Sequence, residues 1–540
     1  MSENEPVSDY PLLRFHKERE RIVLETTRRA LQTVLSQNQP EYILNDACLS
    51  EIRRLSEGHA QEEVRALSEW KRLWRSLGGK SRRMLEQDLE RLIADYAQDV
   101  AGGFQKHVYT FASRVVAPAL SLLLSPENPL KLPFHMLQEE ALLSRLGERL
   151  QVTGPLAKLR ALAARGTLVC VPTHLSNLDS PVMGYALQAA GLPPTTYGAG
   201  KNLFTNPILG FFMRNCGAYR VDRRIRHELY KDVLKTYSQV ILERGYHSMF
   251  FPGGTRSRSG RVEGKLKLGL LGTALTATVE GFRRQAGLAN GAAVRPIFVV
   301  PVTINQQLVL EAETLIADHL KETGKARFII EDDESAQWQK VVDFARSMLT
   351  HTGAIVVRFS EPMDVLGHPV TDTGESIGPH GQVVDLARFF WVAQKPTHVA
   401  QRDTEYMNQT GTAIARAYRR DTVLLPTHLL AHVLWRKVTA ALPSLDLYRR
   451  LRQPLDLHVS DADLCMEMSR LQQQLRNKRH VLGPVADGTP EQVIEAALGA
   501  FASYHTEPVA LRTPSQAVTV VDRQLLYYYQ NRVESLGDEP

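Results

Sequence analysis

The stretch Thr167-Leu-Val-Cys-Val-Pro-Thr-His174-Leu-Ser-Asn-Leu-Asp179-Ser-Pro181 passes from an apolar run through a polar segment to a helix-start signal. The apolar run is short and rich in β-branched residues, which is typical of a buried strand. Ser180 followed by Pro181 predicts the N-cap and the first residue of a helix. This order of strand, loop and helix places His174 at the carboxyl end of a strand, where open α/β sheets bind their ligands.

Apolar runs of the same kind recur later in the chain, each bounded by Gly, Pro or polar residues. They cover residues 248–252, 297–301 and 354–359. Helical patterns lie between them, for example at 229–244 and 269–282. Strands that alternate with helices predict an α/β domain over residues 156–365, with a central mixed sheet flanked by helices.

Helical patterns dominate on both sides of this region. Leu85, Leu89 and Tyr96 recur at helical spacing on a charged background, and we predict an N-terminal helical domain over residues 1–155. After a loop rich in Gly, Pro, Asp and Thr, further helical patterns predict a mostly helical C-terminal domain over residues 366–540.

The composition is that of an ordinary globular protein. The chain has 540 residues, of which 43% are hydrophobic and 23% charged, and its net charge is +6. These values exclude a collagen-like, wholly disordered or small disulfide-stapled protein, and the mildly basic balance suits an anionic partner. The four cysteines are far apart and form no CxxC pair, so we expect reduced thiols in a cytosolic setting.

The sequence predicts neither a secretory signal nor a membrane span. A secretory signal has a basic segment followed by an apolar one, and the first residues show neither. The apolar stretch nearest to a span, residues 115–124, contains Pro118 and is shorter than the roughly 18 to 20 residues that a bilayer requires. We predict a core helix there, with a surface anchor as the alternative.

His174 and Asp179 form the candidate catalytic pair. A histidine held by a carboxylate can act as a general base, because the carboxylate fixes the imidazole tautomer and stabilises the imidazolium. The spacing alone is a weak signal, since five of the 17 histidines have an aspartate five residues later. Only His174 has the strand, loop and helix setting, so we expect the others to be surface or core histidines. These others are His227, His380, His398 and His458.

Cationic and glycine-rich segments follow at the later strand ends. Arginine binds phosphate bidentately through its planar fork, and glycine-rich turns expose amide donors to anions. A base followed by such segments indicates a phosphate-bearing substrate whose hydroxyl is deprotonated. The candidate substrate-binding residues are Lys201, Arg220, Arg223, Gly254, Thr255, Arg256 and Arg258.

In this order, the blocks from about residue 165 to 305 resemble the glycerolipid acyltransferase superfamily. The resemblance is to the glycerol-3-phosphate acyltransferases and their dihydroxyacetone-phosphate acyltransferase relatives in particular. It implies that His174 and Asp179 are the catalytic pair and that Arg223 and Arg256 bind the acceptor phosphate. It also implies that Pro301 lies on the acyl-chain side.

The sequence departs from the family pattern in two places. The third block of the family usually carries a glutamate where this chain has Gly253, and Glu263 lies near in sequence. The second block, which ends at Arg223, resembles the lysophosphatidic acid acyltransferases, whereas residues 256–261 resemble the glycerol-3-phosphate acyltransferases.

The resemblance implies transfer of a fatty acyl group from a thioester, acyl-coenzyme A or acyl carrier protein, to the sn-1 hydroxyl of glycerol 3-phosphate, without a metal or cofactor. Two alternatives stay open. One is a lysophosphatidic acid acyltransferase, and the other is a non-catalytic lipid-binding homologue, which Gly253 would favour. A nucleic-acid partner is not expected, because the basic residues lie in glycine-rich turns rather than along a helix.

We also expect peripheral binding on the cytoplasmic side of a membrane. The apolar segment 208–213 is followed by arginines, a pattern that suits insertion into an anionic leaflet. A buried helical turn is the alternative for this segment.

Overall fold

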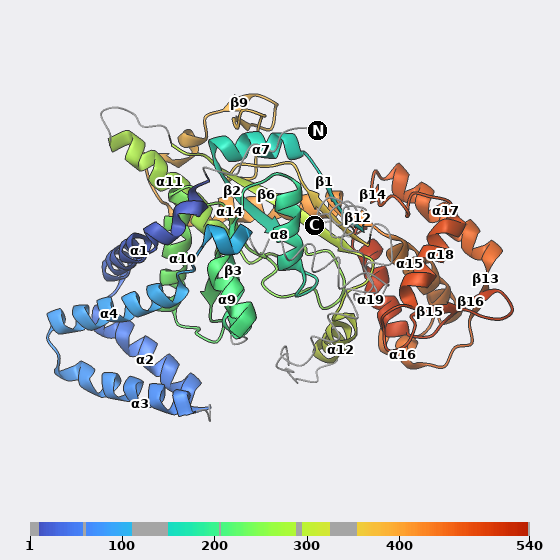
Figure 1. Cartoon of the computed structure of the whole chain (residues 1–540), viewed down its shortest axis with the longest axis horizontal. Helices are drawn as coiled ribbons and strands as arrows, with labels where there is room; N and C mark the ends of the chain where they lie inside the picture. The colour runs from blue at the N-terminus through green and yellow to red at the C-terminus, as the bar shows by residue number, and fades with distance from the viewer. Residues whose placement is uncertain are drawn as a thin grey trace, which may run out of the picture.

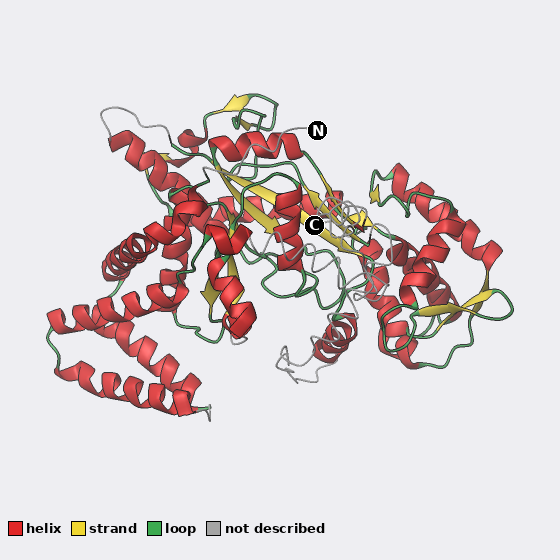
Figure 2. Ribbon diagram, viewed as in Figure 1, coloured by secondary structure: helices red, strands yellow, loops and turns green. Residues whose placement is uncertain are grey.

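The computed structural model describes residues 10–57, 61–110, 149–204, 207–287, 294–323 and 354–537. A central sheet lies between a group of N-terminal helices on one side and a C-terminal group on the other (Figure 1). Helices predominate in both flanking groups (Figure 2), which confirms the predicted fold class. The stretch 115–124 lies outside the described residues.

The sheet in the described residues has seven strands in the order β1-β7-β6-β2-β5-β3-β4. Only β6 and β7 pair antiparallel, so the sheet is mixed, as predicted. Because β2, β5, β3 and β4 are parallel to one another, their carboxyl ends lie at one edge. The strand bounds are β1 Leu150–Thr153, β2 Thr167–Pro172, β3 Thr196–Gly200, β4 Ala218–Val221, β5 Ser248–Met249, β6 Ile297–Gln306 and β7 Ile355–Phe359.

The glycine-rich segments were expected to be loops, but the structure makes strands of two of them. Residues 198–200 belong to β3, and 218–221 form β4. Gly198 leaves room for the Tyr219 ring of the paired strand, since a Cβ at position 198 would lie 3.0 Å from the ring. The expected strand at 248–252 is shortened to two residues, which leaves Phe250 to Pro252 in the loop that follows.

Side chains of the central strands alternate between two apolar cores. Leu168 and Cys170 of β2 enter one core with α7 and α8, whereas Val169 and Val171 enter the other with α11 and α14. The near-continuous burial of β2 and β6 is typical of a sheet covered on both faces. The helix bounds are α7 Leu156–Arg165, α8 Asp179–Ala189, α11 Leu271–Gly287 and α14 Ala400–Asp421.

The N-terminal helices form a separate apolar cluster at one end of the sheet. Helices α1 and α4 pack against α10, and the cluster includes Tyr219 of β4. The bounds are α1 Phe15–Gln37, α2 Pro40–Ser56, α3 Gln61–Ser76, α4 Arg82–Val100 and α10 Glu228–Glu243. Helix α9, Pro207–Asn215, packs against β4.

The C-terminal helices continue the core that holds α7 and α8. The last helix, α19, returns to the sheet, where the buried Arg532 donates to the Ile304 carbonyl oxygen at 3.1 Å. The predicted domain boundaries stay predictions. The remaining principal elements are α12 Ala312–Thr323, α15 Pro426–Ala441, α16 Leu447–Arg452, β13 His458–Ser460, α17 Asp461–Asn477, α18 Pro490–Phe501, β15 Ala510–Arg512, β16 Ala517–Val520 and α19 Arg523–Glu534.

No helix among the described residues is both long and apolar enough to cross a bilayer.

Candidate functional site

His174 and Asp179 lie in contact at the carboxyl end of β2. His174 Nδ1 is 2.9 Å from Asp179 Oδ2. Helix α8 begins at Asp179 itself, two residues before the expected first helical residue, Pro181. Pro181 is tolerated there because its missing N–H falls among the first helical positions, which have no acceptor within the helix.

Asp179 is oriented by donors from the same loop and from the neighbouring strand. Its Oδ2 also accepts from the Leu175 and Ser176 amides, at 2.6 and 2.9 Å. Its Oδ1 accepts from Gln306 Nε2 at 2.7 Å, at the end of β6. Because a carboxylate only accepts, Nδ1 of His174 carries the proton in this contact, and Nε2 keeps its lone pair.

The His174 ring stacks on Phe251, which follows β5. The ring centroids are 4.1 Å apart and the planes differ by 23°. The His174 side chain is 14% exposed and Asp179 is fully buried. Sequence reasoning missed both Phe251 and Gln306, because a contact between separate strand ends leaves no local signal.

The loop after β5 brings Arg256 next to the histidine loop. Gly254 turns the chain with φ +75, and Ser257 N–H donates to the His174 carbonyl oxygen at 2.8 Å. Arg256 Nη1 lies 3.1 Å from Glu311 Oε1. That same oxygen accepts from the Asn177 amide at 3.1 Å, so a single carboxyl group links the two loops. Thr255 is exposed on the turn.

Burial raises the pKa of Glu311, which lies just before α12. Arg256 opposes this rise, as does the hydrogen bond from the Asn177 amide. Glu311 was another residue that sequence reasoning missed.

Glu263 occupies the space beside Gly253. A Cβ at Gly253 would lie 2.7 Å from the carboxyl carbon of Glu263. Glu263 Oε1 accepts from the His174 amide at 2.8 Å. Burial raises the pKa of Glu263 to about 7, against the opposing effects of the His174 amide and Arg532.

The other predicted cations do not contact this centre among the described residues. Arg258 pairs with Glu322 of α12, Arg220 lies 2.6 Å from Asp99, and Lys201 lies 3.4 Å from Asp222. Arg223 is exposed in the turn after β4. Because β5 and β3 lie between β2 and β4, the main chains of β2 and β4 are roughly 14 Å apart.

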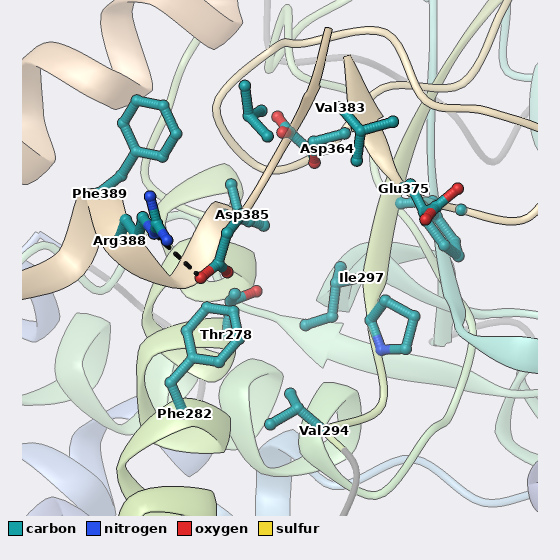
Figure 3. Close-up of a pocket in the computed structure, with 16 residues that line it drawn as sticks. Thr278, Phe282, Val294, Ile297, Asp364, Glu375, Val383, Asp385, Arg388 and Phe389 are labelled. Carbon is teal, nitrogen blue, oxygen red and sulfur yellow. Dashed lines mark ion pairs between the residues drawn. The ribbon is translucent and has the colours of Figure 1, made fainter. Parts of the chain in front are cut away.

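An open cavity of about 830 Å³ lies away from these residues. Figure 3 shows its wall, with Thr278 and Phe282 from α11 opposite Val383 and the ion pair between Asp385 and Arg388. Ile297 belongs to its lining, so the cavity is at the amino end of β6, whereas His174 follows the carboxyl end of β2. None of the predicted site residues lines it.

No cluster of three or more His, Cys, Asp or Glu side chains within the described ranges is arranged to hold a metal ion.

Comparisons with known proteins point to the same region. Residues 151–305 match the family model described as Acyltransferase. A curated relative from Pseudoalteromonas atlantica, named glycerol-3-phosphate acyltransferase, is 33% identical over 172 residues. This alignment covers 32% of the present chain and only 20% of the relative. Residues 151–305 therefore belong to the acyltransferase family, with similarity to its glycerolipid members.

Proposed function

We propose that the chain transfers a fatty acyl group from a thioester to the sn-1 hydroxyl of glycerol 3-phosphate. The observation that carries the proposal is the contact between His174 Nδ1 and Asp179, with Arg256 on the adjoining loop. This arrangement sets a base with a free Nε2 lone pair near a guanidinium that suits phosphate. The thioester is acyl-coenzyme A or acyl carrier protein.

In the proposed reaction, His174 Nε2 accepts the proton of the hydroxyl group as its oxygen attacks the thioester carbonyl carbon. Asp179 stabilises the imidazolium that forms. The tetrahedral intermediate then collapses, the carbon–sulfur bond breaks, and the thiolate leaves with the proton that His174 returns. No acyl-enzyme is needed, so the chain supplies a base and no nucleophile.

The acceptor phosphate is proposed to bind Arg256. Arg256 Nη1 lies 3.1 Å from Glu311 Oε1, so the phosphate would compete with that carboxyl group. The planar guanidinium group of Arg256 offers a pair of parallel N–H donors, which suits bidentate binding of a phosphate.

We further propose that the protein binds peripherally to the cytoplasmic side of a membrane. The support is Phe211 of α9, which is 52% exposed, together with Arg214 in the last turn of that helix. An exposed aromatic ring near cations suits the surface of an anionic leaflet. Flotation with phosphatidylglycerol vesicles should recover the protein with lipid at low salt and less of it at high salt; no flotation at either salt contradicts membrane binding.

The activity is tested by supplying palmitoyl-coenzyme A with either glycerol 3-phosphate or lysophosphatidic acid and identifying the lipid formed. The proposal predicts lysophosphatidic acid from glycerol 3-phosphate. Phosphatidic acid from the second acceptor alone would show the other acyltransferase activity. No thiol release with either acceptor, and with acyl carrier protein as donor, would indicate a non-catalytic homologue.

A further inference from the structure

The loop from Gly253 to Glu263 holds the main chain of His174 on both sides. The His174 amide donates to Glu263 Oε1 at 2.8 Å, and its carbonyl oxygen accepts from the Ser257 amide at 2.8 Å. Asp179 holds the ring through Nδ1 and also accepts from the main-chain amides of Leu175 and Ser176, the two residues after His174. The loop after β5 therefore holds the amide and the carbonyl group of His174 itself, whereas Asp179 holds the ring and the next two amides.

Glu263 reaches His174 because position 253 lacks a side chain. A Cβ at Gly253 would lie 2.7 Å from both Glu263 Cδ and Oε2. Real Cβ atoms essentially never approach another heavy atom so closely, so any larger residue at 253 must displace the carboxyl group. Gly253 and Glu263 thus form one unit, in which the first residue leaves the space that the second fills.

The surroundings make Glu263 costly to keep unless it has a role. Its Oε2 is buried and has no hydrogen-bond partner among the described residues. The charged and titratable groups that act on it come from three helices, Asp179 of α8, Tyr418 of α14 and Arg532 of α19. A buried polar atom without a partner lowers stability, and such costs concentrate at functional sites.

We propose that Glu263 is a positioning residue for acyl transfer, which holds the His174 amide so that the imidazole stays against Asp179 and Phe251. This inference deepens the proposed function and rests on it. Glu263 does not touch the reacting atoms. It acts through the main chain of His174, and it does so only while residue 253 is glycine.

The test compares Glu263→Ala, Glu263→Gln, Gly253→Ala and the double variant Gly253→Ala with Glu263→Ala. Glu228→Gln is the matched control, because Glu228 lies exposed at the start of α10. Circular dichroism first establishes that each variant is folded. The turnover of palmitoyl-coenzyme A with glycerol 3-phosphate is then measured, together with deuterium exchange in peptides that contain His174.

Glu263→Ala should lower kcat by about 10- to 100-fold, since small misplacements of a catalytic group have effects of this size. Exchange at the His174 amide should rise at the same time. Glu263→Gln should keep most of the wild-type kcat and most of the wild-type protection from exchange, because its amide oxygen accepts the same hydrogen bond. Gly253→Ala should resemble Glu263→Ala, and the double variant should be no worse than either, as expected for residues that act as one unit.

The inference is overturned if Glu263→Ala keeps a normal kcat or leaves deuterium exchange at the His174 amide unchanged. It is also overturned if Glu263→Gln lowers kcat as much as Glu263→Ala does, or if the losses of kcat in Gly253→Ala and Glu263→Ala multiply in the double variant. Failure of the proposed function looks different. In that case the wild-type chain forms no lipid, while the exchange measurement still decides whether Glu263 holds His174.

Discussion

Two regions of this molecule contain the same local histidine–aspartate motif. His398 Nδ1 lies 3.1 Å from Asp403 Oδ2, and the Val399 amide donates to that oxygen at 3.1 Å. His174 and Asp179 repeat this pattern at 2.9 Å, with the Leu175 amide in the equivalent place. A histidine just before a helix and an aspartate five residues later, in the first turn of that helix, therefore form the pair in both regions.

The surroundings separate the two pairs. His398 Nε2 faces Glu280 Oε1 at 3.5 Å, so carboxyl groups lie near both of its ring nitrogens. For His174, no partner of Nε2 is found within the described parts of the chain, and Arg256 is on the adjoining loop. The motif is thus a piece of helix-start geometry, and the proposed catalytic pair is distinguished by an Nε2 that faces no carboxyl group among the described residues.

The strongest test of this difference is alanine substitution of the two histidines. His174→Ala should reduce kcat by about 10²- to 10⁴-fold, the usual contribution of a general base. His398→Ala should leave kcat within about twofold, because its ring lies outside the candidate site. Steady-state thiol release with both variants measures this, and equal losses would end the distinction between the pairs.

Substitution of the aspartates should sharpen the comparison. Asp179→Asn removes the acceptor that selects the imidazole tautomer, and we expect kcat to fall by roughly 100-fold or more. Asp403→Asn should leave turnover unchanged and lower stability by at most about 1 kcal/mol, because it removes the ion pair with Arg402. The two readouts are initial rates and thermal melting, and a normal rate for Asp179→Asn would refute the role of the carboxylate.

The two arginines beside these pairs should differ in their effect on substrate binding. Arg256→Ala should raise the KM for glycerol 3-phosphate by about 10- to 100-fold, since a hydrogen bond to a charged group contributes about 1.5 to 3 kcal/mol. Arg402 lies 2.8 Å from Asp403 Oδ1, so Arg402→Ala should leave that KM unchanged. Initial rates measured over a range of glycerol 3-phosphate concentrations give the KM of each variant. An unchanged KM for Arg256→Ala would show that the phosphate binds elsewhere.

The smallest expected effect concerns one glutamate beside each histidine, Glu263 beside His174 and Glu280 beside His398. Their contributions to stability should depend on pH in opposite directions. Burial raises the pKa of Glu263 to about 7, so its contribution to stability is full below its unfolded value and is lost as the pH rises through 7. The hydrogen bond with His398 lowers the pKa of Glu280, so its contribution is present at neutral pH and is lost as the pH falls into the acid range.

Melting curves at pH 5.5 and pH 8 test this contrast. At pH 8, Glu263→Gln should melt roughly 1 to 3 °C above the wild type, because a neutral side chain replaces a buried charge, and the difference should be smaller at pH 5.5, where the folded carboxyl group is protonated. Glu280→Gln should melt below the wild type at pH 8. A change of melting temperature in the same direction for both variants at pH 8 would contradict the environments assigned to Glu263 and Glu280.

The strand and helix pattern was predictable because it depends on local residue choice. The alternation around β2 and β6 and the helices on both flanks follow from periodicity, which the structure confirms. The glycine-rich β3 was not predictable, since its strand form depends on pairing with β4 and β5, which lie elsewhere in the sequence. Its propensity alone favours a turn.

The sequence by itself determined that His174 would follow a strand and that Asp179 would lie within reach of it. Both are local facts, because five residues of chain connect the two side chains. Only the tertiary structure decided what surrounds them. Gln306, Glu263 and Glu311 reach this loop from more than 80 residues away in sequence, as their hydrogen bonds show.

The order of the strands likewise determined which cations could act together. Arg256 follows β5, the immediate neighbour of β2, and lies beside the histidine loop. Arg223 follows β4, with two strands between it and β2. Nothing in the spacing of a sequence encodes that order, because neighbouring strands are selected by long-range pairing and by burial of both faces of the sheet.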